Sequence, residues 1–122
     1  MKIVIKAEPV EVTAELNGSA TAKAIGNSLP LTGQANLWGE EIYFRIPVHV
    51  GLENGKELVE KGDLGFWPEG DAFCIFFGPT PMSSGDEIRP ASAVNVFGKV
   101  TGDAAGFKKV RAGTKIYIER SD

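Results

Sequence analysis

Short runs of alternating apolar and polar residues, separated by turn-forming residues, constrain the fold of this chain most strongly. Residues 10–16 carry an apolar side chain at every second position, a period typical of a β-strand with one buried face. The 15 glycines and 7 prolines are scattered between such runs, where they form turns rather than a flexible linker. The pattern therefore predicts an all-β protein. The predicted strands are residues 3–6, 10–16, 20–24, 42–46, 64–67, 72–77, 94–100 and 114–119.

The first two long runs predict a hairpin. Residues 17–19, Asn-Gly-Ser, separate the alternating run 10–16 from a run of alanines at every second position. A three-residue loop between these runs places Leu16 opposite Ala20 and Ala14 opposite Ala22. We therefore expect a hairpin whose alanines face the interior.

Residues 54–61 carry the one helical pattern. Leu58 and Val59 lie there among charged residues, and Gly62 follows as a stop signal. We expect a short helix that closes one end of the molecule. Eight short strands and one short helix favour a closed barrel, because closure removes exposed sheet edges.

Composition limits the domain organisation and the partners. The chain of 122 residues fits one domain, residues 1–122, and its 43% hydrophobic residues suffice for a core. The net charge is −3 and no basic stripe is present, so we expect no nucleic-acid partner. No apolar run approaches the roughly 20 residues that span a membrane. The single cysteine cannot form an internal disulfide, and the cytoplasm is the expected location.

Few residues carry obvious chemistry. His49 is the only histidine, so we expect neither a metal site nor a cofactor, and we interpret His49 as a loop or strand-end residue. Cys74 lies in an apolar strand and is expected to be buried and inert. Glu40 and Glu41 are adjacent, so on a strand they point to opposite faces and cannot flank one bond together. We interpret them as a solvated strand start.

The aromatic residues suggest a binding surface. They are Trp38, Tyr43, Phe44, Phe66, Trp67, Phe73, Phe76, Phe77 and Phe97. Most are expected in the core, but alternation puts Phe73 and Phe77 on one face of their strand and Cys74 and Phe76 on the other. A loop, a second subunit or a ligand must then cover the outer apolar face, and residues 78–82 are a candidate cover.

Several motifs resemble the cyclophilins, which are peptidyl-prolyl isomerases. Residues 96–100, Val-Phe-Gly-Lys-Val, are similar to a strand near the cyclophilin C-terminus, and residues 43–47, Tyr-Phe-Arg-Ile-Pro, resemble the strand with the catalytic arginine. Residues 70–77 resemble the strand that lines the proline pocket, and residues 29–32, Leu-Pro-Leu-Thr, resemble a cyclophilin helix start.

A small prokaryotic family called cyclophilin-like, without an established activity, is a closer resemblance. Its hallmarks are similar to residues 38–44, 62–68, 76–81 and 94–100, which are distributed over residues 38–100 of the chain. This resemblance implies an eight-stranded closed barrel, in agreement with the strand count. The resemblance to the cyclophilins would make Arg45 the catalytic residue of an isomerase, but Ala72 and Val94 stand where cyclophilins have glutamine and histidine.

Three functions remain open at the level of sequence. The favoured one is a binding module that holds a peptide or a small molecule in an aromatic groove without efficient catalysis. The second is a divergent isomerase that uses Arg45, and the third is a structural homodimer, so both a monomer and a homodimer are considered. The expected groove residues are Tyr43, Trp67, Phe73, Phe77 and Met82, with Arg45 or Arg89 as polar anchor. Arg89 is also placed to pair with Asp86 or Glu87.

Overall fold

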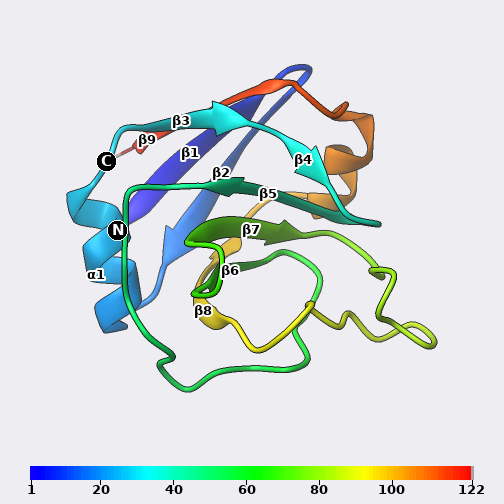
Figure 1. Cartoon of the computed structure of the whole chain (residues 1–122). Helices are drawn as coiled ribbons and strands as arrows, with labels where there is room; N and C mark the ends of the chain where they lie inside the picture. The colour runs from blue at the N-terminus through cyan, green and yellow to red at the C-terminus, as the bar shows by residue number, and fades with distance from the viewer. Residues whose placement is uncertain (122) are drawn as a thin grey trace.

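The computed structural model describes residues 1–121 and shows nine antiparallel strands rolled into a barrel (Figure 1). The strands are β1 Lys2–Ala7, β2 Val10–Leu16, β3 Leu31–Gln34, β4 Asn36–Leu37, β5 Glu41–Arg45, β6 Asp63–Trp67, β7 Ala72–Phe76, β8 Asn95–Val100 and β9 Lys115–Arg120. The α-helix α1 spans Ala20–Asn27, and the 3-10 helix η1 spans Ala104–Lys109. The predicted all-β class is thus confirmed.

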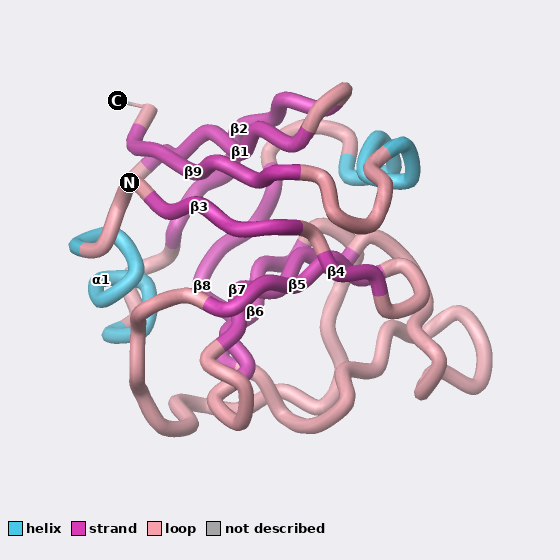
Figure 2. The backbone as a smooth tube through the Cα atoms, turned by 45° about the horizontal axis from the view of Figure 1, so that its top comes forward, coloured by secondary structure: helices cyan, strands magenta, loops and turns pink. Residues whose placement is uncertain are grey.

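One extended segment closes the barrel. The strand order is β3-β9-β1-β2-β8-β6-β7-β5-β4, and its two ends, β3 and β4, are separated only by Ala35 (Figure 2). β3 pairs with β9, whereas β4 pairs with β5. Because one segment pairs at both ends of the sheet, no long edge is left unpaired. The sequence pattern predicted neither β3 nor β4, and one of the eight predicted strands, residues 20–24, is not a strand, so the observed count is nine.

Aromatic rings fill the barrel interior. The Phe73 ring stacks on Phe44 with centroids 5.2 Å apart and meets Phe97 edge-on at 5.0 Å. Phe77 packs against Phe107 of η1 at 6.1 Å. All five rings belong to the main buried cluster. Aromatic side chains bury large areas, so these rings supply much of the stabilisation of a small domain.

The predicted strand at residues 20–24 is wrong, because this segment forms α1. Ser19 begins the helix as N-cap, and its hydroxyl accepts a hydrogen bond from the Ala22 backbone N–H at 3.1 Å. Alanine has the highest helix propensity, and a serine cap adds to it. Ala22 and Ile25 then pack on the barrel. The alternation of the alanines was compatible with a strand, but their helix propensity and the Ser19 cap favour the observed helix.

The predicted helix at residues 54–61 is also wrong. This segment is extended and forms isolated bridges between Lys56 and Val94 and between Val59 and Ile88. A hydrogen bond of 3.0 Å joins the Val59 N–H to the Ile88 carbonyl oxygen. Eight residues form a marginal helix without tertiary packing, and here the tertiary partner is another extended loop. Residues 31–32, expected at a helix start, likewise belong to β3.

Candidate functional site

The outer face of β5, β7 and β6 carries a second apolar cluster, separate from the barrel interior. Its fully buried members on the sheet are Ala72, Cys74 and Phe76 of β7. Val59 and Ile88 cover it from two loops. The prediction that strand 72–77 is apolar on both faces and needs a cover is confirmed. The covering residues differ from the expected segment 78–82, which packs instead against the turn before β5.

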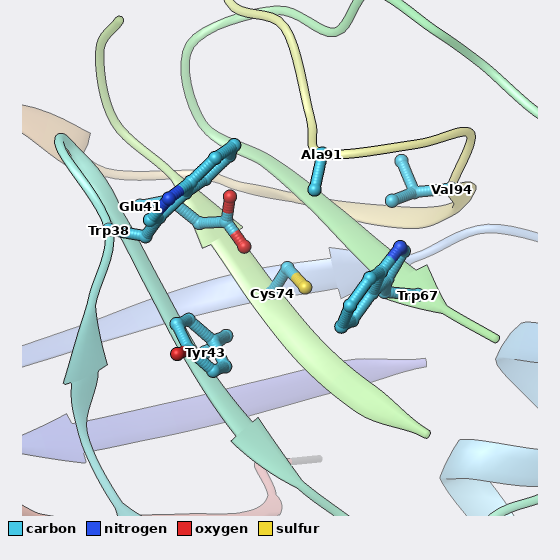
Figure 3. Close-up of a pocket in the computed structure, with 7 residues that line it drawn as sticks. All are labelled: Trp38, Glu41, Tyr43, Trp67, Cys74, Ala91 and Val94. Carbon is cyan, nitrogen blue, oxygen red and sulfur yellow. The ribbon is translucent and has the colours of Figure 1, made fainter. Parts of the chain in front are cut away.

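At the edge of this cluster the cover is incomplete and leaves a pocket of about 190 Å³. We call it the outer pocket. It is lined by Trp38, Glu41, Tyr43, Trp67, Cys74, Ala91 and Val94. Figure 3 shows the Glu41 carboxyl group and the Cys74 thiol between the two indole rings, Trp38 on one side and Trp67 on the other. The three aromatic side chains are partly exposed, so their rings remain available to a ligand.

The Trp67 ring is held by its surroundings. Its indole N–H donates a hydrogen bond of 2.6 Å to the Ser92 hydroxyl, and that hydroxyl in turn bonds the Glu69 carboxylate. The backbone of Gly70 packs under the ring, where an added Cβ would lie 2.7 Å from two ring carbons. The turn between β6 and β7 and the loop before β8 thus fix this wall of the outer pocket.

The Trp38 wall depends on a tight turn. Trp38 and Glu41 exchange backbone hydrogen bonds, 2.9 Å from the Trp38 N–H and 3.2 Å from the Glu41 N–H. Gly39 within the turn has φ +60°, which glycine adopts at no steric cost. It also lies against Pro79 and Thr80, where an added Cβ would approach backbone atoms within 3.0 Å. Trp38 is therefore placed by a turn that only glycine fits.

Glu41 is the acidic group of the outer pocket. Its residue surface is only 6% exposed, so the expectation of a solvated strand start is wrong for Glu41. Burial raises its pKa from 4.5 to about 7, and a hydrogen bond with Cys74 opposes the rise. Glu40 points to the opposite face and lies 3.5 Å from the Lys108 ammonium, so the expectation that the two acids cannot act together is confirmed.

Cys74 is buried, as expected from the sequence. Burial, together with the neighbouring Glu41 carboxyl group, raises the pKa of its thiol well above the ordinary value. A thiol is a nucleophile only when it is deprotonated, so Cys74 forms part of the floor of the outer pocket as a neutral group. His49 lies outside the pocket, exposed, with its Nδ1 atom 2.8 Å from the Asp71 carboxylate.

The structure brings two of the predicted groove residues together, Tyr43 and Trp67. Phe73 and Phe77 do not line a groove, and that prediction is corrected, because their side chains pack in the barrel interior. Met82 is exposed and lies in the loop after β7, away from the pocket lining. The interpretation that Arg89 pairs with a neighbouring acid is supported, since its Nε atom lies 3.8 Å from the Glu87 carboxylate.

Arg45 follows the outward residues Glu41 and Tyr43 on β5 but does not line the outer pocket. Its side chain is exposed beside Ala72 on the neighbouring strand. The structure therefore does not provide the arginine inside an apolar pocket that the isomerase hypothesis requires.

Five of the seven lining residues were not among the predicted groove residues: Trp38, Glu41, Cys74, Ala91 and Val94. A signal for Glu41 was present, since it shares the outward alternation of Tyr43 on the same strand. Ala91 comes from a long loop whose course no local pattern indicates. Within residues 1–121, no group of three or more His, Cys, Asp or Glu side chains could hold a metal ion. Neither helix of the described chain has the length and hydropathy needed to cross a membrane.

The fold and the site define a class: a closed antiparallel barrel with a small aromatic pocket on its outer face. The chain belongs to the cyclophilin-like family, whose model matches residues 1–119. It is also similar to a hypothetical protein from Archaeoglobus fulgidus known from a solution structure, with 42% identity, coverage of 99% of this chain and 95% of that chain, and a TM-score of 0.83. No curated protein matches the chain. The family resemblance inferred from the sequence is confirmed.

Proposed function

We propose that this protein binds a small ligand in the outer pocket. The observation that carries the proposal is the placement of a buried carboxyl group between two partly exposed indole rings, of which Trp67 is held by a hydrogen bond to Ser92. Burying an acid without a cationic partner costs stability, and such groups gather at functional sites. Apolar walls with one polar group are the usual composition of a ligand site.

The size of the outer pocket sets the size of the ligand. A volume of about 190 Å³ is below the roughly 300–1,000 Å³ of sites for drug-sized molecules. It corresponds to about six water molecules at roughly 30 Å³ each. The ligand is therefore a small molecule, or a single side chain of a peptide. The cytoplasm is the proposed location, since the one cysteine is a free thiol.

The two tryptophans make a direct test possible. They are the only tryptophans in the chain and form opposite walls of the outer pocket, so the two indole N–H signals in a ¹H–¹⁵N spectrum report on both walls. A library of small fragments should contain compounds that shift both signals. Ala91→Leu, at an exposed lining position, should abolish these shifts by filling the pocket.

Ala20→Leu is the matched control, since Ala20 is exposed on α1 and lies outside the pocket lining. It should leave the shifts unchanged. The proposal is rejected when no fragment shifts both signals, or when Ala91→Leu responds as the unmodified protein does.

The two alternative functions have less support. An isomerase would need Arg45 in the pocket, and Arg45 lies outside its lining. A homodimer was considered because the outer face of β7 is apolar, but loops of the same chain cover that face through Val59 and Ile88. We therefore favour the binding protein over both.

A further inference from the structure

The outer pocket has an uncompensated acidic character. Among its seven lining residues Glu41 is the only acid, and none is basic. The side chain of Glu41 has no ion pair within residues 1–121, and its one polar contact is the Cys74 thiol. In contrast, the neighbouring Glu40 pairs with Lys108. A carboxyl group that is buried, open to a pocket and without a cation has a vacant partner position.

The walls around this carboxyl group suit a positive charge. Three rings line the pocket: Trp38 from the turn before β5, Tyr43 from β5 and Trp67 from β6. A cation over an aromatic face is attracted by the ring quadrupole, most strongly for tryptophan, and the attraction increases when water is excluded. Substituted ammonium groups are the ligands that such aromatic walls bind best, because their alkyl groups also bury apolar area.

Other ligand charges fit less well. An anion would meet the Glu41 carboxylate in a pocket that offers no basic side chain. A neutral apolar ligand would remove the remaining water from the carboxyl group without providing a hydrogen bond or an opposite charge to replace it. An ammonium ion with a few carbon substituents satisfies the carboxylate, the rings and the volume of about 190 Å³ together.

We infer that the outer pocket selects an organic cation, an alkylammonium group held against the Glu41 carboxylate between Trp38 and Trp67. This inference rests on the proposed small-ligand function and names its ligand class. A free amine and a methylated lysine side chain present the same chemistry, and the experiment below separates these two sources.

The inference gives binding a defined dependence on pH. The titratable lining residues besides Glu41 are Cys74 of β7, whose thiol contacts the Glu41 carboxyl group, and Tyr43 of β5. Burial raises the pKa of the Cys74 thiol, so this thiol is neutral near pH 7. The other lining side chains, from β6 and the loops, do not titrate. Since the pKa of Glu41 is about 7, roughly a tenth of the carboxyl groups is ionised at pH 6 and about nine tenths at pH 8. A permanent cation should therefore bind about tenfold more tightly at pH 8.

The test compares cations with a neutral molecule of the same shape. Tetramethylammonium, butylammonium, choline and 3,3-dimethylbutan-1-ol, the uncharged carbon analogue of choline, are titrated into the protein while both indole signals are followed. At least one cation should shift both signals, with a dissociation constant about tenfold lower at pH 8 than at pH 6. The neutral analogue should bind more weakly than choline and show no such dependence.

Variants assign the effect to one carboxyl group. Glu41→Gln keeps the shape and removes the charge, and should weaken cation binding by about tenfold or more without weakening the neutral analogue. Glu40→Gln, on the opposite face, should change neither. A peptide with trimethyllysine, compared with the same peptide carrying unmodified lysine, separates the two sources: binding of the free cation alone indicates a small amine, and tighter binding of the methylated peptide indicates a protein ligand.

Each outcome decides one of the two proposals. If the neutral analogue binds as tightly as choline, if binding is tighter at pH 6, or if Glu41→Gln binds cations as well as the wild type does, the cation inference is overturned while the ligand-binding proposal stands. If no cation shifts the indole signals although neutral fragments do, the cation inference is overturned in the same way. If no compound of either kind shifts both signals, both proposals fail.

Discussion

At the scale of single residues, the ionisation of Glu41 contributes to the pH dependence of stability. Burial raises its pKa from 4.5 to about 7, so between these values the folded state binds more protons than the unfolded state. Stability therefore decreases as pH rises through this window. The full shift corresponds to about 3 kcal/mol at pH 8. We expect Glu41→Gln to be more stable than the wild type at pH 8, by up to about 3 kcal/mol, with the difference vanishing near pH 4.

Urea unfolding at pH 4, 6 and 8 measures this difference. Glu40→Gln is the matched control, since Glu40 is partly exposed and paired with Lys108, and its free energy of unfolding should follow that of the wild type at each pH. A stability difference for Glu41→Gln that is the same at all three pH values would show that the carboxyl group is not the cause. The cost that this acid imposes without a ligand is the reason to regard it as functional.

At the scale of elements, α1 depends on contacts at its N-terminus. Ser19 caps the helix, and the Glu53 carboxylate accepts hydrogen bonds from the backbone N–H groups of Ala20 and Thr21 at 3.0 and 2.9 Å. We expect Ser19→Ala to lower the free energy of unfolding by about 1 kcal/mol, because one backbone donor loses its partner. Ser19→Asn, which can also cap, should retain most of the stability. Equal losses in both variants would contradict a capping role.

The turn between β6 and β7 gives a second prediction at this scale. In Gly70→Ala the new Cβ would lie 2.7 Å from the Trp67 ring, so the ring must move and its bond to Ser92 must change. We expect the Trp67 indole signal to shift, the Trp38 signal to stay, and pocket ligands to bind about tenfold more weakly. Gly102→Ala, with nothing within 4 Å of the added atom, is the control. Unchanged binding in Gly70→Ala would mean that the position of Trp67 does not matter.

Elements with strong alternation and clear turn signals could be predicted from the sequence, and elements set by tertiary contacts could not. Strands β2, β7 and β8 were predicted close to their observed bounds. The alanine run at residues 20–24 was compatible with both the strand period and the helix period, and the N-cap at Ser19 favours the helix. The segment that closes the barrel has Gly33 at its centre, packed against the Phe44 ring, and this contact has no local sequence signature.

The same division holds for the candidate site. Tyr43 and Trp67 were predicted correctly because aromatic residues on the outer face of a strand indicate a binding surface. Phe73 and Phe77 were assigned to the wrong face of the barrel. Alternation gives the relative faces of a strand but does not say which face is inside when both are apolar. Glu41 was missed because alternation places it on the same face as Tyr43 but does not show that this face is buried at Glu41.

At the scale of the whole molecule, membership of the cyclophilin-like family establishes the fold and leaves the activity to the site. Prolyl isomerisation needs a pocket that grips the ring and a donor that weakens the resonance of the amide. Of the rings expected to grip the proline, Phe73 and Phe77 are inside the barrel, whereas Trp67 lines the outer pocket. Arg45 lies outside that lining, so the pocket has an aromatic wall but no arginine beside it.

We expect that the purified protein, at roughly micromolar concentration, does not accelerate the isomerisation of a proline tetrapeptide. The uncatalysed reaction takes tens to hundreds of seconds. Arg45→Ala should behave in the same way, and a ligand bound in the outer pocket should have no effect on the rate. Acceleration that Arg45→Ala abolishes would show that the exposed arginine moves over the pocket in solution. The pocket ligand should then act as a competitive inhibitor, which would join binding and catalysis in one site.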